Sequence, residues 1–563
     1  MPTKPRRTSS TSDVGGVGGI EGAMVFAARL NTLNASAPSP AHFVFVPYDQ
    51  LSAQIGPLSR LSAAALGVVV VECPAKAAKR PYHRQKLALL LTNLRHFALE
   101  QAAAGRRVVH LVSDGGGDYA SALRPFAAKH GPLLCMTPAE RELRSDLQPL
   151  VDDGLLEMVA HEGWLSDADD FAHASKSGAA PWRMDAFYRQ QRTRTGLLMV
   201  DGKPEGGRFS HDGDNREAWK GQPPAPTPPR FVVDDVTAEV VAMVDRVFAD
   251  HPGAIDAGAL PASADDAEAL WQWAMVECLP HFGPYEDAMS TRSRGLFHTR
   301  ISGLLNLHRL LPRRVVDDVA ALPIPLQSRE GFVRQVLGWR EFVRHVHTAT
   351  DGFRRGPGAD VDGAPNFVGA HAPLPAAFWP ASWKGARSGL RCLDLVVEDV
   401  WAESYSHHIG RLMVLANIAT LLDIEPRALC DWFWVAYVDA YDWVVEPNVL
   451  GMGTFAAGDV MTTKPYVAGA AYIDKMSDYC AGCAFKPKKS VDVGGCPLTS
   501  LYWAYLQRHA AVLADVDRLA LPLAASRKRT SEQVAHAAFV FDVVTQTLAA
   551  GQPLTPKLFA SKK

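Results

Sequence analysis

A strand–helix–strand pattern occupies GVVVVEC (67–73), PYHRQKLALLLTNLRHFALEQAAAG (81–105) and RRVVHLVSD (106–114). The two outer segments are apolar runs of strand length. In the middle segment apolar residues recur every three to four positions and a glycine ends the run, which is typical of an amphipathic helix. This order predicts parallel strands joined by a helix that covers the sheet.

The same alternation extends to both sides in HFVFVPYDQL (42–51), GPLLCM (131–136) and LLEMVAHEGWL (155–165). We therefore expect an α/β N-terminal domain with a parallel sheet over residues 39–170. Residues 201–230 are polar with six Pro and five Gly, and indicate a connector over 171–235. Later apolar patterns have helical spacing, as in GFVRQVLGWREFVRHVHTAT (331–350), and predict a large all-α domain over 236–555.

Composition places the 563-residue chain among globular proteins, with 47% hydrophobic and 21% charged residues. The balance of 58 Lys and Arg against 60 Asp and Glu gives a net charge of −2, so a nucleic acid would have to meet a local basic patch. No apolar run approaches the ~18 residues of a membrane span, and the N-terminus lacks the apolar core of a secretory signal. We expect a cytoplasmic monomer whose residues 1–38 form a disordered arm.

Cysteines suggest a metal site. Cys480 and Cys483 form a Cys-x-x-Cys pair, and Cys496 follows directly before a proline. A zinc ion and a [4Fe–4S] cluster both require four thiolates, and the fourth is not local. Candidates for it are Cys392 and Cys430, with Cys73, Cys135 and Cys278 more remote. The alternative is an unligated pair accompanied by buried structural cysteines.

Three further segments carry residues that could take part in catalysis or in cofactor binding. His407 and His408 share an apolar helix with Arg411 and could shuttle a proton, although such a pair can also be merely half-buried. DWFWVAYVDAYDW (431–443) is aromatic and acidic, and predicts either core packing or a cofactor wall with Trp electron relays. RSRGLFHTRISGLLNLHRLLPRR (292–314) resembles a helix start that binds phosphate.

These residues converge on a family. GLRCLDLVVEDVWAESYSHHIGRLMVLANIATLL (389–422), WFWVAYVDAYDWVVEPNVLGMGTF (432–455) and TTKPYVAGAAYIDKMSDYCAGC (462–483) resemble the iron–sulfur bacterial cryptochromes and photolyases, which include the prokaryotic (6-4) photolyases. The resemblance covers residues 42–550. It implies an α/β antenna domain, a long connector and a helical domain that binds FAD and a [4Fe–4S] cluster.

The resemblance also assigns cofactor residues. It places the cluster on Cys392, Cys480, Cys483 and Cys496. It implies FAD contacts at Thr299, Arg300, Ser302, Arg340, Arg411 and Asp439. Trp432 would be the inner electron relay, with Trp379 and Trp383 competing for the outer position. The implied antenna chromophore is 6,7-dimethyl-8-ribityllumazine.

The resemblance further assigns the DNA-facing groups. His408 matches the essential histidine of (6-4) photolyases, with His407 beside it, and Tyr466 matches a tyrosine of the lesion pocket. Trp339 would face the DNA cavity, and Lys486 belongs to a basic set near the cluster segment. Asp212 could hold Mg²⁺ near DNA or be a solvated acid of the connector.

The implied function is blue-light-driven repair of (6-4) pyrimidine photoproducts in UV-damaged DNA, by electron transfer from reduced FAD. This lesion requires a proton as well as an electron, which a positioned histidine can supply. One alternative is a cryptochrome-type photoreceptor with the same cofactors. Another is a DNA-binding protein stabilised by iron–sulfur or zinc, without photochemistry.

Overall fold

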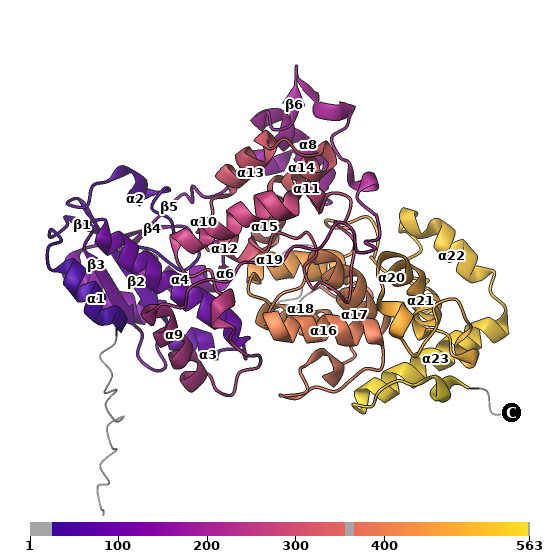
Figure 1. The fold of residues 1–563 in the computed structure, drawn as a ribbon. Helices are drawn as coiled ribbons and strands as arrows, with labels where there is room; N and C mark the ends of the chain where they lie inside the picture. The colour runs from indigo at the N-terminus through magenta and orange to yellow at the C-terminus, as the bar shows by residue number, and fades with distance from the viewer. Residues whose placement is uncertain (1–24, 355–364, 561–563) are drawn as a thin grey trace, which may run out of the picture.

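A five-stranded parallel sheet forms the N-terminal part of the molecule, at the left of Figure 1. The computed structural model describes residues 25–354 and 365–560. The strand order is β3-β2-β1-β4-β5, and each strand overlaps one of the predicted apolar runs. The strands are β1 His42–Phe45, β2 Leu66–Glu72, β3 Val108–Val112, β4 Leu133–Met136 and β5 Leu156–Val159.

Strand β2 is buried along its whole length, as expected of an inner parallel strand covered on both faces. Its Val68 lies opposite Val44 of β1 and Val108 of β3. Helix α4 (Arg84–Ala103) packs on it, and the ring of His83 caps α4 by accepting the N–H of Gln85 at 3.1 Å. The other helices of this part are α2 Pro57–Arg60, α3 Pro74–Ala78, α5 Tyr119–His130 and α6 Arg141–Asp152.

The predicted disordered arm is wrong for part of its length. Residues Val25–Asn34 form helix α1, whose Phe26 and Leu30 are buried. Its neighbours are α4 and α9 (Asp235–Val247), so the apolar side chains of this short helix have a surface to cover. The first 24 residues of the predicted arm lie outside the described residues.

The region expected to be a connector contains ordered elements that pack on the helical part of the molecule. Helix α8 (Met184–Thr195) packs against η5 (Arg334–Arg340), and α9, which we placed in the helical domain, packs on α4. Residues 215–233 contain no helix or strand. The remaining elements are α7 Ala168–Ala172, β6 Met199–Val200, β7 Lys203–Pro204, η1 Glu205–Gly207 and η2 Asp212–Asp214.

Helices build the rest of the molecule. Among the described residues from 236 onwards, the only β-structure consists of isolated β-bridges, so the predicted fold class is confirmed. The C-terminal helices α20–α23 lie at the right of Figure 1. The α-helices are α10 Ala264–Trp273, α11 Leu279–Phe282, α12 Ser302–Asn306, α13 Pro312–Ala321, α14 Leu326–Val333, α15 Glu341–Thr350, α16 Arg391–Glu403, α17 Asn417–Leu421, α18 Pro426–Ala436, α19 Asp442–Glu446, α20 Ala470–Met476, α21 Pro497–Arg508, α22 Ala520–Arg527 and α23 Ser531–Ala549.

Wider π-helical turns interrupt these helices at four places: η4 Ala274–Cys278, η5 Arg334–Arg340, η7 Gly410–Ala416 and η8 Pro447–Gly453. Such turns re-aim side chains and are frequent at functional sites. Here η5 carries Trp339 and Arg340, and η7 carries Arg411. None of the helices in the described ranges has the length and apolar character needed to cross a membrane.

Candidate functional site

An arginine–aspartate pair lies at the centre of the helical part. Arg411 donates two hydrogen bonds of 2.9 Å to the carboxylate of Asp439, and Ser302 donates a third of 2.7 Å. Burial opposes the charge of Asp439, but Arg411 and Ser302 hold the pKa of its carboxyl below the ordinary value. The guanidinium of Arg411 also lies 4.1 Å from the ring centroid of Tyr437. The two charges therefore stabilise each other in a largely buried setting.

The segment before α12 carries the residues expected to hold the flavin phosphates. Thr299 is buried, and Arg300 has a φ of 59° where the chain turns into α12. The guanidinium of Arg300 donates to Glu403 at 2.7 Å and lies 4.8 Å from the ring centroid of Tyr405. Arg300 would therefore exchange or share this carboxylate partner on binding a phosphate.

Arg340 approaches α12 from η5. Its Nη2 donates to the carbonyl of Leu305 at 3.1 Å, and its guanidinium lies 4.2 Å from the ring centroid of Trp164. Burial lowers the pKa of Arg340 to about 10, so the group stays charged at neutral pH. The structure thus gathers around this helix Ser302, Arg340, Arg411 and Asp439.

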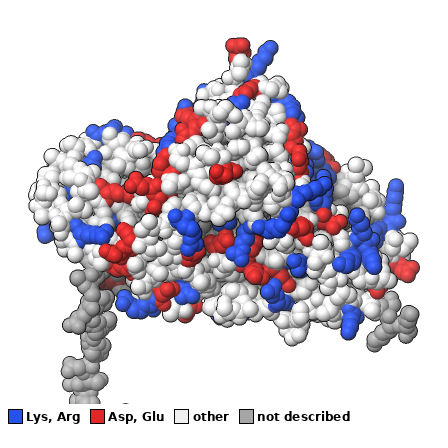
Figure 2. All heavy atoms as spheres, in the orientation of Figure 1, with Lys and Arg blue, Asp and Glu red and all other residues white. Residues whose placement is uncertain are grey.

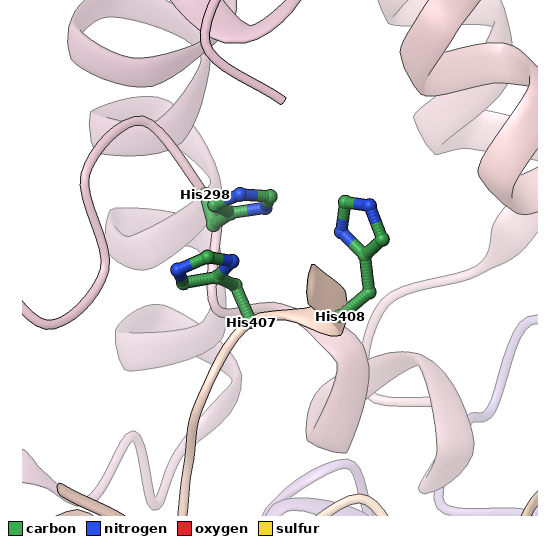
Figure 3. Close-up of side chains that lie close together, drawn as sticks. All are labelled: His298, His407 and His408. Carbon is green, nitrogen blue, oxygen red and sulfur yellow. The ribbon is translucent and has the colours of Figure 1, made fainter. Parts of the chain in front are cut away.

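Three histidines lie next to this group (Figure 3). His407 precedes the helical turn that leads into η7, and His408 begins it. The backbone N–H of Arg411 donates to the carbonyl of His407 at 3.4 Å. His298, from the loop before α12, stacks on His407 with ring centroids 4.5 Å apart and planes 9° apart. His298 belongs to the segment 292–314, whose sequence pattern predicts no role for this histidine.

His408 and His407 have opposite environments. The side chain of His408 is 41% exposed, and its Nε2 lies 3.4 Å from Oδ1 of Asp287. Burial lowers the pKa of His408, but the carboxylate of Asp287 outweighs this and raises it above the ordinary value. Burial and the neighbouring His408 lower the pKa of His407 to about 3. His408 is therefore the better proton carrier of the two.

Asp287 was missed by the sequence analysis because it belongs to no motif and lies far from His408 in the chain. Its other oxygen, Oδ2, accepts a hydrogen bond of 3.2 Å from the hydroxyl of Tyr472. This contact fixes the carboxylate in place beside the histidine. No local sequence signal marks such a pairing.

The connector folds back over Asp287. Arg216 lies 4.0 Å from Asp287 and also pairs with Asp212, whose other oxygen faces Arg334 at 3.2 Å. Tyr466 is half-buried near the same groups, and burial followed by the charge of Asp212 raises the pKa of Tyr466. Asp212 is thus an ion-paired acid rather than an isolated solvated one. Two guanidinium groups already neutralise it, which leaves little reason for a divalent cation to bind there.

Four tryptophans form a chain of ring contacts. Trp432 is edge-on to Trp401 at 6.2 Å, Trp401 stacks on Trp379 at 5.5 Å, and Trp379 contacts the half-buried Trp383 at 4.8 Å. At the inner end Trp432 lies 6.1 Å from Tyr437, the ring over which Arg411 is placed. Trp379 and Trp383 are therefore successive members of one chain. Trp401, which sequence reasoning missed, links them to Trp432.

Cys392, Cys480, Cys483 and Cys496 line one small cavity. Cys430 lies elsewhere, on α18 beside Arg427, so of the two nearer candidates only Cys392 joins the other three. Burial raises the pKa of Cys480 to about 11 and that of Cys496 to about 12. These thiols would stay protonated at neutral pH unless a metal displaced the protons.

The four sulfurs are not arranged as the ligands of one zinc ion. Four thiolates around one zinc are about 3.8 Å apart, from a Zn–S bond of about 2.3 Å in a tetrahedron. Among the described residues, no three of these sulfurs lie within 4.8 Å of one another. Some of these sulfurs thus lie farther apart than the ligands of a single zinc ion.

The predicted DNA-facing residues lie on two different segments. Trp339 is half-buried on η5, edge-on to Phe342 at 6.1 Å. Lys486 is exposed, and its Nζ donates to the carbonyl of Cys483 at 3.0 Å, so it lies directly beside the cysteine cavity. Figure 2 shows Lys and Arg side chains gathered on the side of the visible face where the C-terminal helices lie. Further exposed basic residues near this segment are Arg387, Arg391, Lys464, Lys488 and Lys489.

A second cavity lies where the sheet meets the helical part. Tyr48, at the carboxyl end of β1, stacks with Tyr441 at 6.1 Å, and Tyr119 and Trp434 complete an aromatic lining. Lys86 reaches the same cavity, where its Nζ donates to the carbonyl of Trp434 at 2.7 Å. Ligands of α/β proteins commonly bind at this edge of the sheet. No sequence motif predicts the residues of this cavity.

Comparison with known proteins places this geometry in a family. Residues 44–259 match the model of the deoxyribodipyrimidine photo-lyase-related proteins. The chain is 32% identical over 510 residues to the (6-4) photolyase of Agrobacterium fabrum, covering 88% of this chain and 97% of that protein. It also resembles the crystal structure of a bacterial class III photolyase from Agrobacterium tumefaciens, with a TM-score of 0.51 at 15% identity, over 91% of this chain and 98% of that one.

The fold is thus that of a bacterial photolyase, with an α/β part followed by a helical part. The chain belongs to the photolyase-related family, as its motifs predicted.

Proposed function

We propose that this protein repairs (6-4) pyrimidine photoproducts in DNA with blue light absorbed by bound FAD. The observation that carries the proposal is the position of His408, which Asp287 holds in hydrogen-bonding distance one helical turn from Arg411. The 32% identical relative is a (6-4) photolyase, which supports the choice of lesion.

The flavin would be held around α12. Arg411 and Asp439 would lie beside its ring system, and Thr299, Arg300 and Ser302 would face its phosphates, with Arg340 approaching from η5. When bound and reduced, FAD supplies an excited-state electron to the lesion. The bidentate Arg411–Asp439 pair suits this place because it keeps a positive charge in a fixed orientation.

His408 would act as the proton donor. A damaged base must leave the stack to be reached, and the partial exposure of His408 makes it accessible to such a flipped base. A (6-4) lesion needs this proton because a hydroxyl group has to return to the neighbouring base. His407 is buried and neutral, so it orients the site rather than donating. Tyr466 and Trp339 would line the lesion pocket.

A [4Fe–4S] cluster would occupy the cavity of the four cysteines and tie α16 to the segment between α20 and α21. The chain from Trp432 through Trp401 and Trp379 to Trp383 would carry electrons from the surface to the flavin.

The aromatic cavity at the sheet edge is the best place for the antenna lumazine, since stacked tyrosines suit a flat chromophore. We propose that the protein acts on UV-damaged DNA as a monomer, with Lys486 and its basic neighbours contacting phosphates. We do not propose Mg²⁺ at Asp212, because Arg216 and Arg334 already pair with it.

The test is repair of an oligonucleotide with one (6-4) photoproduct, by reduced protein, in blue light and in darkness. The wild type should restore the undamaged bases in the light alone. His408→Ala should lower the rate at least about 100-fold, the lower end of the usual effect of a general acid. His371→Ala, at an exposed histidine, is the matched control and should repair normally.

Flavin content and binding of the damaged oligonucleotide are measured on each variant to show that the site is otherwise intact. Wild-type rates in His408→Ala would show that the acid is another group. A wild type that carries flavin but repairs no lesion would contradict the proposal and favour a photoreceptor.

A further inference from the structure

His298, His407 and His408 each bring one ring nitrogen within 4.8 Å of the other two. Among the described residues, no other group of three His, Cys, Asp or Glu side chains brings its ligand atoms this close together. Figure 3 shows the three rings around a common space, with His298 stacked over His407 and His408 facing them. The proposed repair reaction uses only His408 directly, so the third histidine needs its own explanation.

The hydrogen bond of His298 leaves one nitrogen free to bind. His298 is 7% exposed, and its Nε2 lies 3.1 Å from the backbone carbonyl of Glu286. A carbonyl oxygen can only accept, so Nε2 carries the proton and Nδ1 keeps its lone pair. Histidines that ligate metals almost always donate their other nitrogen to an oxygen in this way.

His408 shows the second common form of the same arrangement. Its Nε2 faces the carboxylate of Asp287 at 3.4 Å, and that carboxylate is itself fixed by the hydroxyl of Tyr472. This leaves Nδ1 of His408 as the available ligand atom. A carboxylate that orients a histidine and strengthens its lone pair is the typical support of a zinc ligand.

His407 supplies the independent observation that points to a ligand. It is 6% exposed, and its Nδ1 is buried without a hydrogen-bond partner. Buried polar atoms in folded proteins are nearly always paired, so an unpaired one marks a place where a ligand can bind. A cation bound between the rings would be coordinated by this nitrogen or by the other nitrogen of the same ring.

We propose that His298, His407 and His408 form a binding site for a transition-metal cation of the Zn²⁺ type. Imidazole nitrogens suit Zn²⁺, Cu²⁺ and Ni²⁺, whereas Mg²⁺ and Ca²⁺ prefer oxygen. Three tetrahedral ligands at about 2.1 Å from zinc stand about 3.4 Å apart, so nitrogens within 4.8 Å of one another must close by up to about 1.4 Å. His408 can move because its side chain is 41% exposed. His298 or His407 must also tilt, because their planes are only 9° apart and each nitrogen lone pair lies in the plane of its ring.

Occupation of the site would inhibit repair, an inference that rests on the proposed function. A cation on Nδ1 of His408 leaves Nε2–H directed at Asp287, and the positive charge opposes protonation of the ring. The histidine then has no proton to give to the lesion. The predicted effect is reversible inhibition by Zn²⁺, relieved by a chelator.

Binding is tested on the holoprotein in darkness, by equilibrium dialysis against Zn²⁺ at a buffered free concentration. His298→Gln and His408→Ala should each bind about one Zn²⁺ less per chain than the wild type, or bind it at least about tenfold more weakly. His371→Gln, at an exposed histidine, should bind as the wild type does. Zinc bound by the cysteines is common to all four proteins and cancels in the comparison.

His408→Ala keeps the test valid if the buried His298→Gln does not fold, because a half-exposed side chain is replaced. Unchanged binding in both folded variants would overturn the site. Repair rates are then compared with and without Zn²⁺, each protein against its own metal-free rate, and His298→Gln should lose the inhibition. If Zn²⁺ binds as predicted but the metal-free wild type repairs no (6-4) lesion, the site stands and the proposed function fails.

Discussion

Arg411→Met is expected to lower the free energy of unfolding by about 3 kcal/mol. The change leaves the carboxylate of Asp439, which is 7% exposed, without its two hydrogen bonds of 2.9 Å. Removing one partner of a buried ion pair costs about 3–5 kcal/mol. We expect the lower end, because Arg411 is 23% exposed and Ser302 still donates to Asp439.

The double variant Arg411→Met/Asp439→Leu separates the unpaired charge from other effects. It removes both charges, and apolar replacement of a buried pair is often close to neutral. The double variant should therefore recover at least about half of the lost stability. Arg313→Met removes the exposed partner of Asp317 and should cost no more than about 1 kcal/mol.

Urea unfolding followed by circular dichroism measures these differences, with added FAD held constant because a bound ligand also stabilises the folded state. Flavin-to-protein absorbance ratios give the second measurement. Both Arg411 variants should carry less FAD. A double variant no more stable than the single one would refute the argument about the buried charge, and normal flavin content in both would remove the pair from the FAD site.

Three further predictions concern other parts of the molecule. Cys483→Ala should abolish soluble, cluster-containing protein, whereas Cys73→Ala should not. Iron and sulfide at about four each per wild-type chain would identify the cluster. A folded, cluster-free Cys483→Ala protein would show that the cluster is not structural. Trp401→Phe should slow flavin photoreduction strongly, whereas Trp503→Phe, at a ring beside Arg529, should not; equal rates would mean that electrons take another path. Burial lowers the pKa of His83 to about 4. Below pH 6.5 the unfolded chain therefore binds a proton at His83 that the folded chain does not bind. This difference should contribute about 2 kcal/mol to the loss of stability between pH 7 and pH 5. That contribution should be missing from the pH dependence of His83→Gln, measured by urea unfolding; an unchanged dependence would contradict it.

Some elements could be predicted because their signals are local. The five strands and α4 lie where apolar runs and helical spacing placed them, because the spacing of apolar residues along each segment shows which of its faces is buried. Helix α1 was not predicted, because its few apolar residues follow a long polar arm and their partners on α4 and α9 are distant in the chain. Helix α9 was likewise assigned to the wrong part, because its periodicity does not reveal which surface it covers.

The candidate site divides in the same way. Motifs and the resemblance they carry were sufficient to name Arg411, Asp439 and the Cys-x-x-Cys pair, because these residues lie in recognisable segments. The spacing of the cysteines could not choose Cys392 over Cys430, since both are buried thiols on helices. The resemblance named Cys392, and in the structure Cys392 lines the same cavity as the other three cysteines.

Tertiary structure alone decided the partners. Asp287 beside His408, Trp401 between Trp432 and Trp379, and His298 on His407 are all contacts between segments far apart in the chain or on different faces. Hydrogen bonds, ring contacts and proton affinities depend on distances of a few ångströms and on burial, which no local pattern of residues encodes. The sequence by itself thus determined which chemical groups the protein carries and in what kind of fold, and the packing of its helices determined which of them can act together.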